Sequence, residues 1–284
     1  MTTVYLNGEF LPRDQAKVSV LDRGFLFADS IYEVIPVHHG KYFLGEEHLQ
    51  RLDRSLLAID LNCGLSHSEW FTIFDKLMAQ YDDKTQAYSI YLQVTRGVDV
   101  ERNHAFPITA IQPTVFVQIT PATTMPIDKI KRGLSVIVAD DTRWVRNSIK
   151  STSLLPSIIQ RDLATQQKAD EAILVREGYV SEATASNVYM VKDGVILTHP
   201  EDGRILGGIT RGLTVELANK FNMPLEERAI LREELYDADE IWLSSAAKDV
   251  APVVTIDGEM VADGKPGPVW QQMWQHFQDY KANL

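Results

Sequence analysis

Short runs of alternating apolar and polar residues, separated by pairs that favour tight turns, recur along the chain. Asn7-Gly8 joins two such runs in TVYLNGEFLP, and His39-Gly40 does the same in SIYEVIPVHHGKYFLG. Glu177-Gly178 and Asp193-Gly194 stand at two further positions of this kind. Such pairs tolerate the positive φ that a two-residue hairpin turn requires. The pattern therefore predicts hairpin turns at all four places.

Apolar residues at helical spacing predict the main helices. EEHLQRLDRSLLAID, residues 46–60, has its leucines and isoleucine on one face. HSEWFTIFDKLMAQYD predicts a second helix with Ser68 as N-cap, and GITRGLTVELANKFN predicts a third that glycines open. The last helix, GPVWQQMWQHFQDYK, carries an apolar stripe that is typical of a core or subunit contact: Trp270, Met273, Trp274 and Phe277.

The segment TPATTMPID, residues 120–128, contains two prolines and has no hydrophobic period. It predicts a connection between two mixed domains of unequal size, which makes the chain an α+β protein. We place the N-terminal domain at 1–120, the linker at 121–126 and the C-terminal domain at 127–284.

Composition excludes several classes of function. The net charge of -11 and the pI near 5.1 argue against a nucleic acid or an anionic membrane surface as partner. Cys63 is the single cysteine, so neither an intrachain disulfide nor a cysteine metal site is expected, and no metal is predicted. The first residues lack the features of a signal peptide, and no apolar run is long enough to span a membrane. We therefore expect a cytoplasmic protein.

Lys150 is the first candidate for chemistry, in RNSIKSTSLLPSII. Its neighbours Ile149, Leu154 and Leu155 predict a buried corner between a strand and a helix, where burial would lower the pKa of the amine. A neutral amine can form a Schiff base with an aldehyde and then move a proton. The alternative is an ordinary solvated lysine at the start of a helix, which is the commoner case for a lysine taken at random.

Glu182, in YVSEATASNVYMV, is the second candidate. A carboxylate on an internal strand is costly unless it is paired. Its partner could be a protonated ring nitrogen of a cofactor, or the glutamate could simply bond to its own loop.

RILGGITRG predicts an anion site at the start of a helix. Gly207-Gly208 allow a close backbone approach, and Thr210 can cap the helix. Arg51 could add positive charge, and Ser244-Ser245 at a strand end could add hydroxyls. Each feature is also ordinary turn or surface chemistry, so this site stays open on local grounds. The loop RNHAFP adds Arg102 and His104, which with Tyr32 could form a carboxylate site if the three converge.

The order of these segments resembles the fold type IV pyridoxal-phosphate enzymes, most closely the D-amino acid aminotransferases, over nearly the whole chain. The resemblance implies a smaller N-terminal α/β domain and a larger C-terminal domain with a mixed, barrel-like sheet. The stretches that carry it are DRGFLFADSIYEV, EEHLQRL, LQVTRG with RNHAFP, RWVRNSIKSTSLL, EATASNVY, THPEDGRILGGITRG and DEIWLSSAAKDVAPVVTIDG.

The resemblance also implies roles for single residues. Lys150 would form the aldimine with pyridoxal 5'-phosphate and move the proton in a ping-pong reaction, and Glu182 would pair with the pyridine nitrogen. The cofactor phosphate would be bound by Arg51, Ile209, Thr210, Ser245 and Ala246. The substrate would be bound by Tyr32, Arg102, His104 and Thr184. In the family the arginine and histidine come from the neighbouring subunit, which implies a homodimer.

Some positions depart from the family pattern. Ala28-Asp29-Ser30 replaces the common GDG, and Ser148 stands where an aspartate is common. Ala246 replaces a hydroxyl residue, and Thr184 stands in place of a serine. These changes bear on side-chain preference more than on the reaction itself.

The predicted reaction is transamination of D-amino acids, D-alanine above all, with a 2-oxo acid such as 2-oxoglutarate or pyruvate as acceptor. Aminodeoxychorismate lyase is the nearest alternative, followed by a branched-chain L-amino acid aminotransferase or an R-selective amine transaminase. A phosphometabolite-binding protein without catalysis is the alternative from another class.

Overall fold

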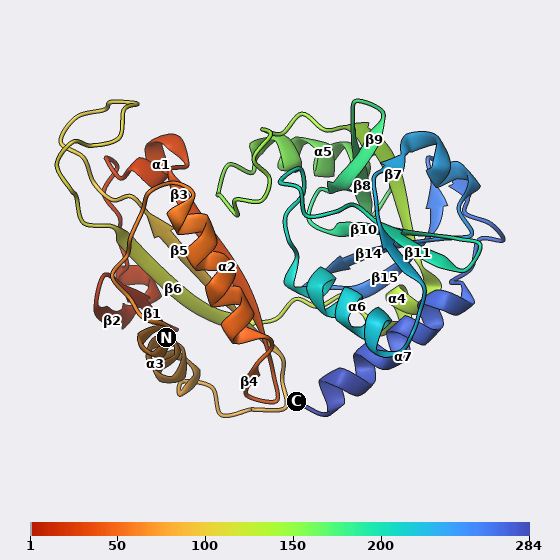
Figure 1. The fold of residues 1–284 in the computed structure, drawn as a ribbon. Coiled ribbons are helices and arrows are strands. Elements are labelled where there is room, and N and C mark those ends of the chain that lie inside the picture. The colour runs from red at the N-terminus through yellow and green to blue at the C-terminus, as the bar shows by residue number, and fades with distance from the viewer. Residues whose placement is uncertain (1) are drawn as a thin grey trace. The chain divides into compact units, whose positions relative to one another are not determined.

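The computed structural model describes residues 2–284, which form two compact units (Figure 1). The first runs up to Thr123 and includes Ile149–Ser153, and the second contains Thr124–Ser148 and Leu154–Leu284. The short segment that carries Lys150 thus packs with the first unit, although it lies far along the chain. The domain limits 1–120 and 127–284 stay a prediction.

The first unit is built on an antiparallel six-stranded sheet in the order β2-β1-β6-β5-β3-β4. The strands are β1 (Thr3–Leu6), β2 (Glu9–Pro12), β3 (Ser30–His38), β4 (Lys41–Tyr42), β5 (Tyr88–Thr95) and β6 (Thr114–Pro121). Asn7-Gly8 and His39-Gly40 connect hairpin partners, and all four residues have positive φ. The two predicted turns are confirmed.

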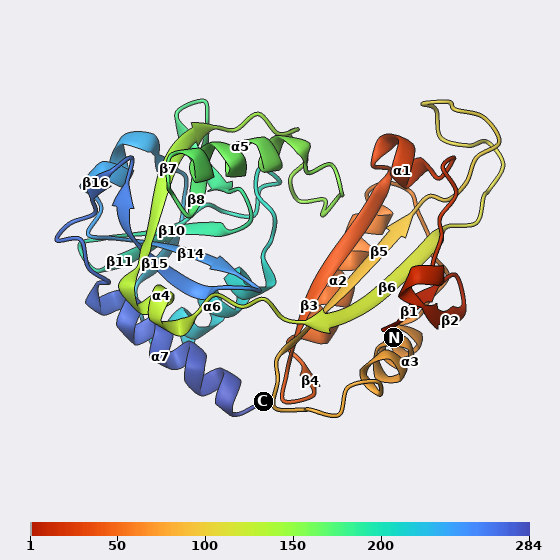
Figure 2. The same cartoon turned by 180° about the vertical axis from the view of Figure 1, so that it is seen from behind.

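The helices of this unit are η1 (Arg13–Gln15), α1 (Arg23–Phe27), α2 (Gly45–Leu57) and α3 (His67–Met78). The buried face of α2, with Leu49, Leu52 and Leu56, joins α3 and the sheet in one apolar core. Figures 1 and 2 show α2 lying along one face of the strands. The predicted N-cap Ser68 is wrong: Ser66 caps α3, because Glu69 bonds back to its backbone N–H in a capping box.

The second unit holds a mixed ten-stranded sheet in the order β12-β11-β10-β14-β15-β7-β8-β9-β13, with β16 beside β15. Neighbours are antiparallel except in the pairs β15–β7, β7–β8 and β11–β12. The strands are β7 (Leu134–Asp140), β8 (Glu171–Arg176), β9 (Tyr179–Ala183), β10 (Asn187–Lys192), β11 (Val195–Thr198), β12 (Leu225–Glu227), β13 (Ile230–Leu231), β14 (Glu240–Ser245), β15 (Asp249–Ile256) and β16 (Glu259–Met260). Glu177-Gly178 and Asp193-Gly194 form the predicted turns, again with positive φ.

The helices of the second unit are α4 (Ile127–Arg132), α5 (Leu155–Gln166), α6 (Ile209–Lys220), η2 (Arg232–Asp237) and α7 (Pro268–Ala282). In both views α5 and α7 lie on opposite sides of the curled sheet. Trp270, Met273 and Phe277 of α7 are buried, as the stripe predicted, whereas Trp274 is only partly buried. The α+β class with a barrel-like second sheet is confirmed. Within residues 2–284, no helix has the length and apolar character that a membrane crossing would need.

Candidate active site

Lys150 lies in an extended segment that runs beside the start of β3. Its carbonyl accepts a hydrogen bond from Tyr32 N–H at 3.0 Å, and its own N–H donates to Ser55 Oγ on α2 at 3.3 Å. Two residues on, Thr152 N–H donates to the Ser30 carbonyl at 3.2 Å, and the two side-chain hydroxyls are also bonded. These contacts fix the backbone on both sides of the lysine.

The surroundings of Lys150 differ in part from the predicted buried corner. Ile149 is buried, but Leu154 and Leu155 are exposed, and Lys150 itself is only partly buried. The Lys150 ammonium lies 4.3 Å from the centre of the Tyr32 ring, a cation–π contact. Lys248 is the more buried lysine: it is 8% exposed and forms an ion pair with Glu171. A search for buried lysines would therefore have selected Lys248 and not Lys150.

Arg51 is held by the buried carboxylate of Glu33, which was not among the residues predicted from the sequence. Its Nε donates to Glu33 Oε1 at 2.7 Å and its Nη2 to Oε2 at 2.8 Å, a two-pronged pair. His48 Nδ1 lies 2.8 Å from Glu33 Oε2. Burial raises the pKa of Glu33, but the charge and hydrogen bonds of Arg51 outweigh it, so the net pKa is far below the ordinary value. Burial lowers the pKa of His48, although the hydrogen bond and charge of Glu33 act in the opposite direction.

Arg102 and His104 lie together on one aromatic ring. The Arg102 guanidinium is 5.0 Å from the centre of the Phe27 ring, and the His104 ring meets the same ring edge-on at 5.3 Å. Tyr32 instead stacks on Tyr91 at 5.9 Å. In the described part of one chain the structure brings Arg102 and His104 together, and shows no hydrogen bond or ring contact from either to Tyr32.

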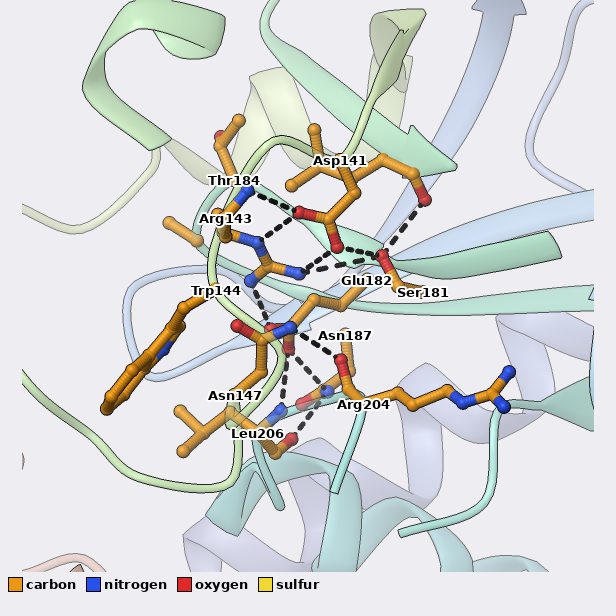
Figure 3. A network of polar contacts seen from close by, with 12 residues as sticks. Asp141, Arg143, Trp144, Asn147, Ser181, Glu182, Thr184, Asn187, Arg204 and Leu206 are labelled. Carbon is orange, nitrogen blue, oxygen red and sulfur yellow. Dashed lines mark hydrogen bonds and ion pairs between the residues drawn. The ribbon is translucent and has the colours of Figure 1, made fainter. Parts of the chain in front are cut away.

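Glu182 is a buried carboxylate in the second unit (Figure 3). Its Oε1 accepts from Arg143 Nη1, and its Oε2 accepts from Leu206 N–H at 3.0 Å and from Asn187 Nδ2 at 3.4 Å. Figure 3 shows the Arg143 guanidinium between Glu182 and Asp141. Burial raises the pKa of Glu182, and the opposing effect of Arg143 does not cancel that rise.

Arg143 divides its hydrogen bonds between Asp141 and Glu182, which explains why it does not cancel the rise in the pKa of Glu182. Its Nε and Nη2 donate to both oxygens of Asp141, at 2.9 and 2.8 Å, and Ser181 Oγ adds a third bond to that carboxylate at 2.8 Å. Burial raises the pKa of Asp141, but the bonds from Arg143 outweigh it and the net pKa is lowered. Asp141 and Arg143 were not predicted from the sequence, although an acidic and a basic residue stand two positions apart just after the strand β7.

The start of α6 offers free backbone donors. Gly208 precedes the helix in extended backbone, and no side chain of the described residues caps it. A Cβ at Gly208 would lie 2.0 Å from Asn187 Oδ1, so a larger residue here would displace the Asn187 side chain that bonds to Glu182. Thr210 lies within the first turn rather than at the cap, which corrects the predicted capping role, while Ile209 is the first helical residue. A helix start of this kind suits an anion.

Ser245, Ala246 and Thr184 lie at turns of the same unit. Ser245 ends β14, and Ala246 lies in the turn that leads to β15. Thr184 is buried after β9, and its hydroxyl lies 3.3 Å from Glu171 Oε1. Glu171 also accepts from the Ala185 N–H at 2.8 Å and from Lys248. The loop that follows Glu182 is therefore anchored by a buried ion pair.

The departures from the family pattern have local consequences. Ala28 ends α1 in the left-handed conformation, with φ of 55°, where glycine would be less strained. Ser30 is buried and bonds to Thr152, so it takes part in fixing the lysine segment. Ser148 is exposed in a turn, and nothing in the structure explains its choice.

Comparison with known proteins identifies the family. The sequence profile of amino-transferase class IV matches residues 30–256. The chain belongs to the class IV aminotransferases. It is therefore a pyridoxal-phosphate-dependent enzyme that transfers amino groups.

This class IV aminotransferase is similar to curated proteins over nearly its whole length. A D-alanine aminotransferase of Staphylococcus aureus (strain COL) is 41% identical over 280 residues, which are 99% of this chain and 98% of the relative. A D-alanine aminotransferase of Listeria monocytogenes serotype 1/2a (strain 10403S) is 40% identical over 276 residues, 96% of this chain and 94% of the relative.

Solved structures show the same fold. A branched-chain amino acid aminotransferase from Escherichia coli has a TM-score of 0.89 at 26% identity, covering 98% of this chain and 93% of that one. A branched-chain aminotransferase from Thermoproteus uzoniensis has a TM-score of 0.86 at 26% identity, with the same coverage.

The residues present fit pyridoxal phosphate. Glu182 is a buried carboxylate that has a basic neighbour and could meet a ring cation. The uncapped start of α6 suits a phosphate. Lys150 supplies a primary amine on a fixed backbone. Taken one by one, the amine suits an aldehyde, the carboxylate suits a pyridine nitrogen, and the helix start suits a phosphate.

Proposed function

We propose that this aminotransferase acts on D-amino acids, D-alanine in particular, with a 2-oxo acid such as 2-oxoglutarate or pyruvate as amino acceptor. Two D-alanine aminotransferases at 40–41% identity over nearly the full chain support this choice. The observation that carries it is the pairing of Arg102 and His104 on Phe27. A guanidinium and an imidazole side by side suit an α-carboxylate, which they would bind by charge-assisted hydrogen bonds.

The proposal assigns the proton transfer to Lys150. Bound pyridoxal phosphate supplies an electron sink for the charge that develops at the substrate Cα. The Lys150 amine would remove the Cα proton as base and deliver it to the cofactor carbon as acid. The backbone bonds at Tyr32 and Ser55 support this role by limiting how far the amine can move. Tyr32 lies beside the amine and is assigned to substrate binding, as is Thr184.

Glu182 is assigned to the pyridine nitrogen, whose proton it would hold. Its burial makes a bare negative charge unfavourable, so a cationic ring nitrogen would be a preferred partner. Asn187 and Leu206 N–H orient the carboxylate from one side. For the phosphate, the proposal assigns these residues: Arg51, Ile209, Thr210, Ser245 and, through its backbone, Ala246.

We further propose a homodimer located in the cytoplasm, with Arg102 and His104 serving the neighbouring subunit. Exposed apolar side chains on the loop that carries this pair support a subunit contact there. The exposed side chains of that loop include Val98, Val100, Phe106 and Ile108, and nearby segments add Val18, Val20, Leu21 and Phe25.

The test compares substrates directly. The enzyme is loaded with pyridoxal phosphate and incubated with 2-oxoglutarate and either D-alanine or L-leucine, and formation of the keto acid is followed. We expect turnover of D-alanine and little of L-leucine. Turnover of L-leucine without D-alanine would overturn the proposal.

Arg102→Ala tests the carboxylate role within the same assay. It should raise KM for D-alanine strongly while the cofactor stays bound. Arg54→Ala is the matched control, because Arg54 is an exposed arginine on α2 to which we assign no role. Loss of the cofactor from Arg102→Ala would mean that the residue does not serve the substrate.

A branched-chain L-amino acid aminotransferase is the second candidate, because two such enzymes share this fold with TM-scores of 0.89 and 0.86. Their identity of 26% is well below that of the D-alanine relatives. Aminodeoxychorismate lyase remains a third candidate from the sequence, and release of pyruvate from aminodeoxychorismate would reveal it.

A further inference from the structure

Arg23 is a buried arginine to which no role has been assigned so far. It is 2% exposed, at the first position of α1. Its Nε donates to Asp29 Oδ2 at 2.9 Å. Its Nη1 donates to the Asn103 carbonyl at 2.6 Å, and its Nη2 lies 3.3 Å from the His104 carbonyl. One guanidinium thus binds both a carboxylate and the backbone of the loop that carries Arg102 and His104.

Asp29, the carboxylate that pairs with Arg23, is also paired with a second arginine, Arg96. Arg96 Nε and Nη2 donate to the two Asp29 oxygens at 2.8 and 3.1 Å. Arg96 also donates to the carbonyls of Ile59 and Asp60, just beyond α2, at 2.7 and 3.1 Å. The carboxylate therefore stays paired with Arg96 even when Arg23 is removed.

Phe27 connects this cluster to the two substrate-binding side chains. Its ring centre lies 5.0 Å from the Arg23 guanidinium and 5.0 Å from that of Arg102, and it contacts the His104 ring. Asp22, buried before α1, holds the helix in place by accepting from Gly24 N–H, Thr95 and Thr114. Phe27 is therefore a fixed surface beside a loop whose own residues are exposed.

An exposed loop that must present two side chains in one geometry loses conformational freedom when it binds a ligand. Within one chain Arg102, Asn103 and His104 are all exposed, so packing inside their own loop does not hold them. Bonds from Arg23 to two successive carbonyls restrict the backbone beforehand. The same bonds are charge-assisted, since the donor is a guanidinium.

We propose that Arg23 is a positioning residue for substrate binding: it fixes the backbone at Asn103 and His104 so that Phe27 can orient Arg102 and His104 toward the substrate carboxylate. The inference rests on the proposed carboxylate role of that pair. It predicts that Arg23 affects the binding of carboxylates and leaves the proton transfer at Lys150 intact.

Two substitutions separate positioning from folding. Arg23→Met removes every bond of the guanidinium while keeping an apolar stem, and Asp29 retains its pair with Arg96. Arg23→Lys keeps a cation for Asp29 but cannot bind the acid and both carbonyls at once, because an ammonium lacks the planar set of donors. Arg54→Met, an exposed arginine on α2, is the matched control.

The experiment uses the holoenzyme and three readouts: KM and kcat for D-alanine, the inhibition constant of propionate as a carboxylate without an amine, and amide hydrogen exchange of residues 98–106. For Arg23→Met we expect KM and the propionate constant to rise together by about 10- to 100-fold, the factor that one or two charge-assisted bonds supply. We expect kcat within about threefold of wild type, and faster exchange in the loop. Arg23→Lys should show the same direction with a smaller rise.

Several results would overturn the inference. One is faster loop exchange with unchanged KM, and another is a fall in kcat that tracks a lower melting temperature while the propionate constant stays constant. If Arg23→Met does not fold, Arg23→Lys decides: wild-type KM in that variant contradicts the inference. Arg102→Ala is assayed in parallel. If it raises KM and the Arg23 variants do not, the inference alone fails, whereas an unchanged KM in Arg102→Ala removes the proposed carboxylate site as well.

Discussion

Glu33 and Glu182 are both buried carboxylates beside an arginine, yet the two environments shift the pKa in opposite directions. Arg51 gives both prongs of its guanidinium to Glu33, and His48 adds a further bond. Arg143 gives its two-pronged pair to Asp141 and reaches Glu182 with one nitrogen. The pKa of Glu33 is therefore lowered, while that of Glu182 is raised by burial.

This difference separates two uses of a buried acid. Glu33 has its charge fully compensated within the first unit, and its main effect is to hold Arg51 in one orientation. Glu182 is compensated only in part, so a further positive charge would stabilise it. A structural anchor and a cofactor partner can thus be told apart by how each arginine distributes its hydrogen bonds.

The largest expected effect is on folding at Glu33. Glu33→Gln leaves the buried Arg51 without a counter-charge, which should lower the free energy of unfolding by about 3–5 kcal/mol. Urea unfolding of the cofactor-free protein at pH 7 measures this. A loss below about 1 kcal/mol would mean that the pair is not the anchor described here.

Glu182→Gln should affect turnover strongly and stability little, the reverse of what we expect for Glu33→Gln. Asp141 keeps Arg143 paired, so the free energy of unfolding of the cofactor-free variant should change far less than in Glu33→Gln. Turnover of D-alanine should fall by roughly 100-fold, because a neutral amide stabilises the charged ring nitrogen poorly. Steady-state kinetics and urea unfolding on the same samples check both parts, and a large stability loss with normal kcat would reverse the comparison.

The pH dependence of stability should differ in sign between the two sites. The lowered pKa of Glu33 makes its contribution present above the unfolded value of about 4.3, and lost as the pH falls toward the folded value. The raised pKa of Glu182 makes its contribution present below about 4.3, and lost as the pH rises through the folded value.

Unfolding of wild type and both glutamine variants between pH 3 and 7 measures these slopes. The wild-type advantage over Glu33→Gln should grow with rising pH, whereas the advantage over Glu182→Gln should shrink. Parallel slopes for the two variants would contradict the assignment.

The smallest expected effect is on stability at His67, whose ion pairs lie at the surface instead of in the interior. His67 bridges Glu46 and Asp53 at 2.7 and 2.8 Å. Partial burial lowers the pKa of His67, but the bonds to Asp53 and Glu46 outweigh it and the net pKa is raised. His67→Gln should cost at most about 0.5 kcal/mol at pH 6, because both acids are exposed and the pair is screened by solvent.

That contribution should vanish as the pH rises through the raised pKa of His67, since only the cation pairs with the acids. Thermal unfolding at pH 6 and pH 9 checks it. A loss at pH 9 equal to that at pH 6 would show that the charge of the ring is not the source of the effect.

Local chemistry explains what the sequence could predict of the fold. The four turn pairs adopt positive φ because their own residues permit it, and the face of α2 follows from its own periodicity. The cap of α3 was misplaced because Ser66 and Ser68 both precede the apolar run, and only the geometry of Glu69 decides between them.

Contacts between distant residues explain what was missed. Lys150 and Glu182 were singled out from their local sequence and given roles by family order, but Glu33 is 18 residues from Arg51, and Arg143 is 39 residues from Glu182. The periodicity of a short segment carries no information about contacts between residues so far apart in the sequence. Burial was a misleading argument for Lys150, because Leu154 and Leu155 are exposed and Lys248 is the more buried lysine.

One measurement tests the central claim, that Lys150 is the lysine that bonds to the cofactor. The enzyme is loaded with pyridoxal phosphate, reduced with borohydride, digested and mapped by mass spectrometry. We predict a visible absorbance before reduction and a pyridoxyl label confined to the peptide that contains Lys150, absent from Lys150→Arg. A colourless protein, or a label on Lys248 instead, would contradict the account.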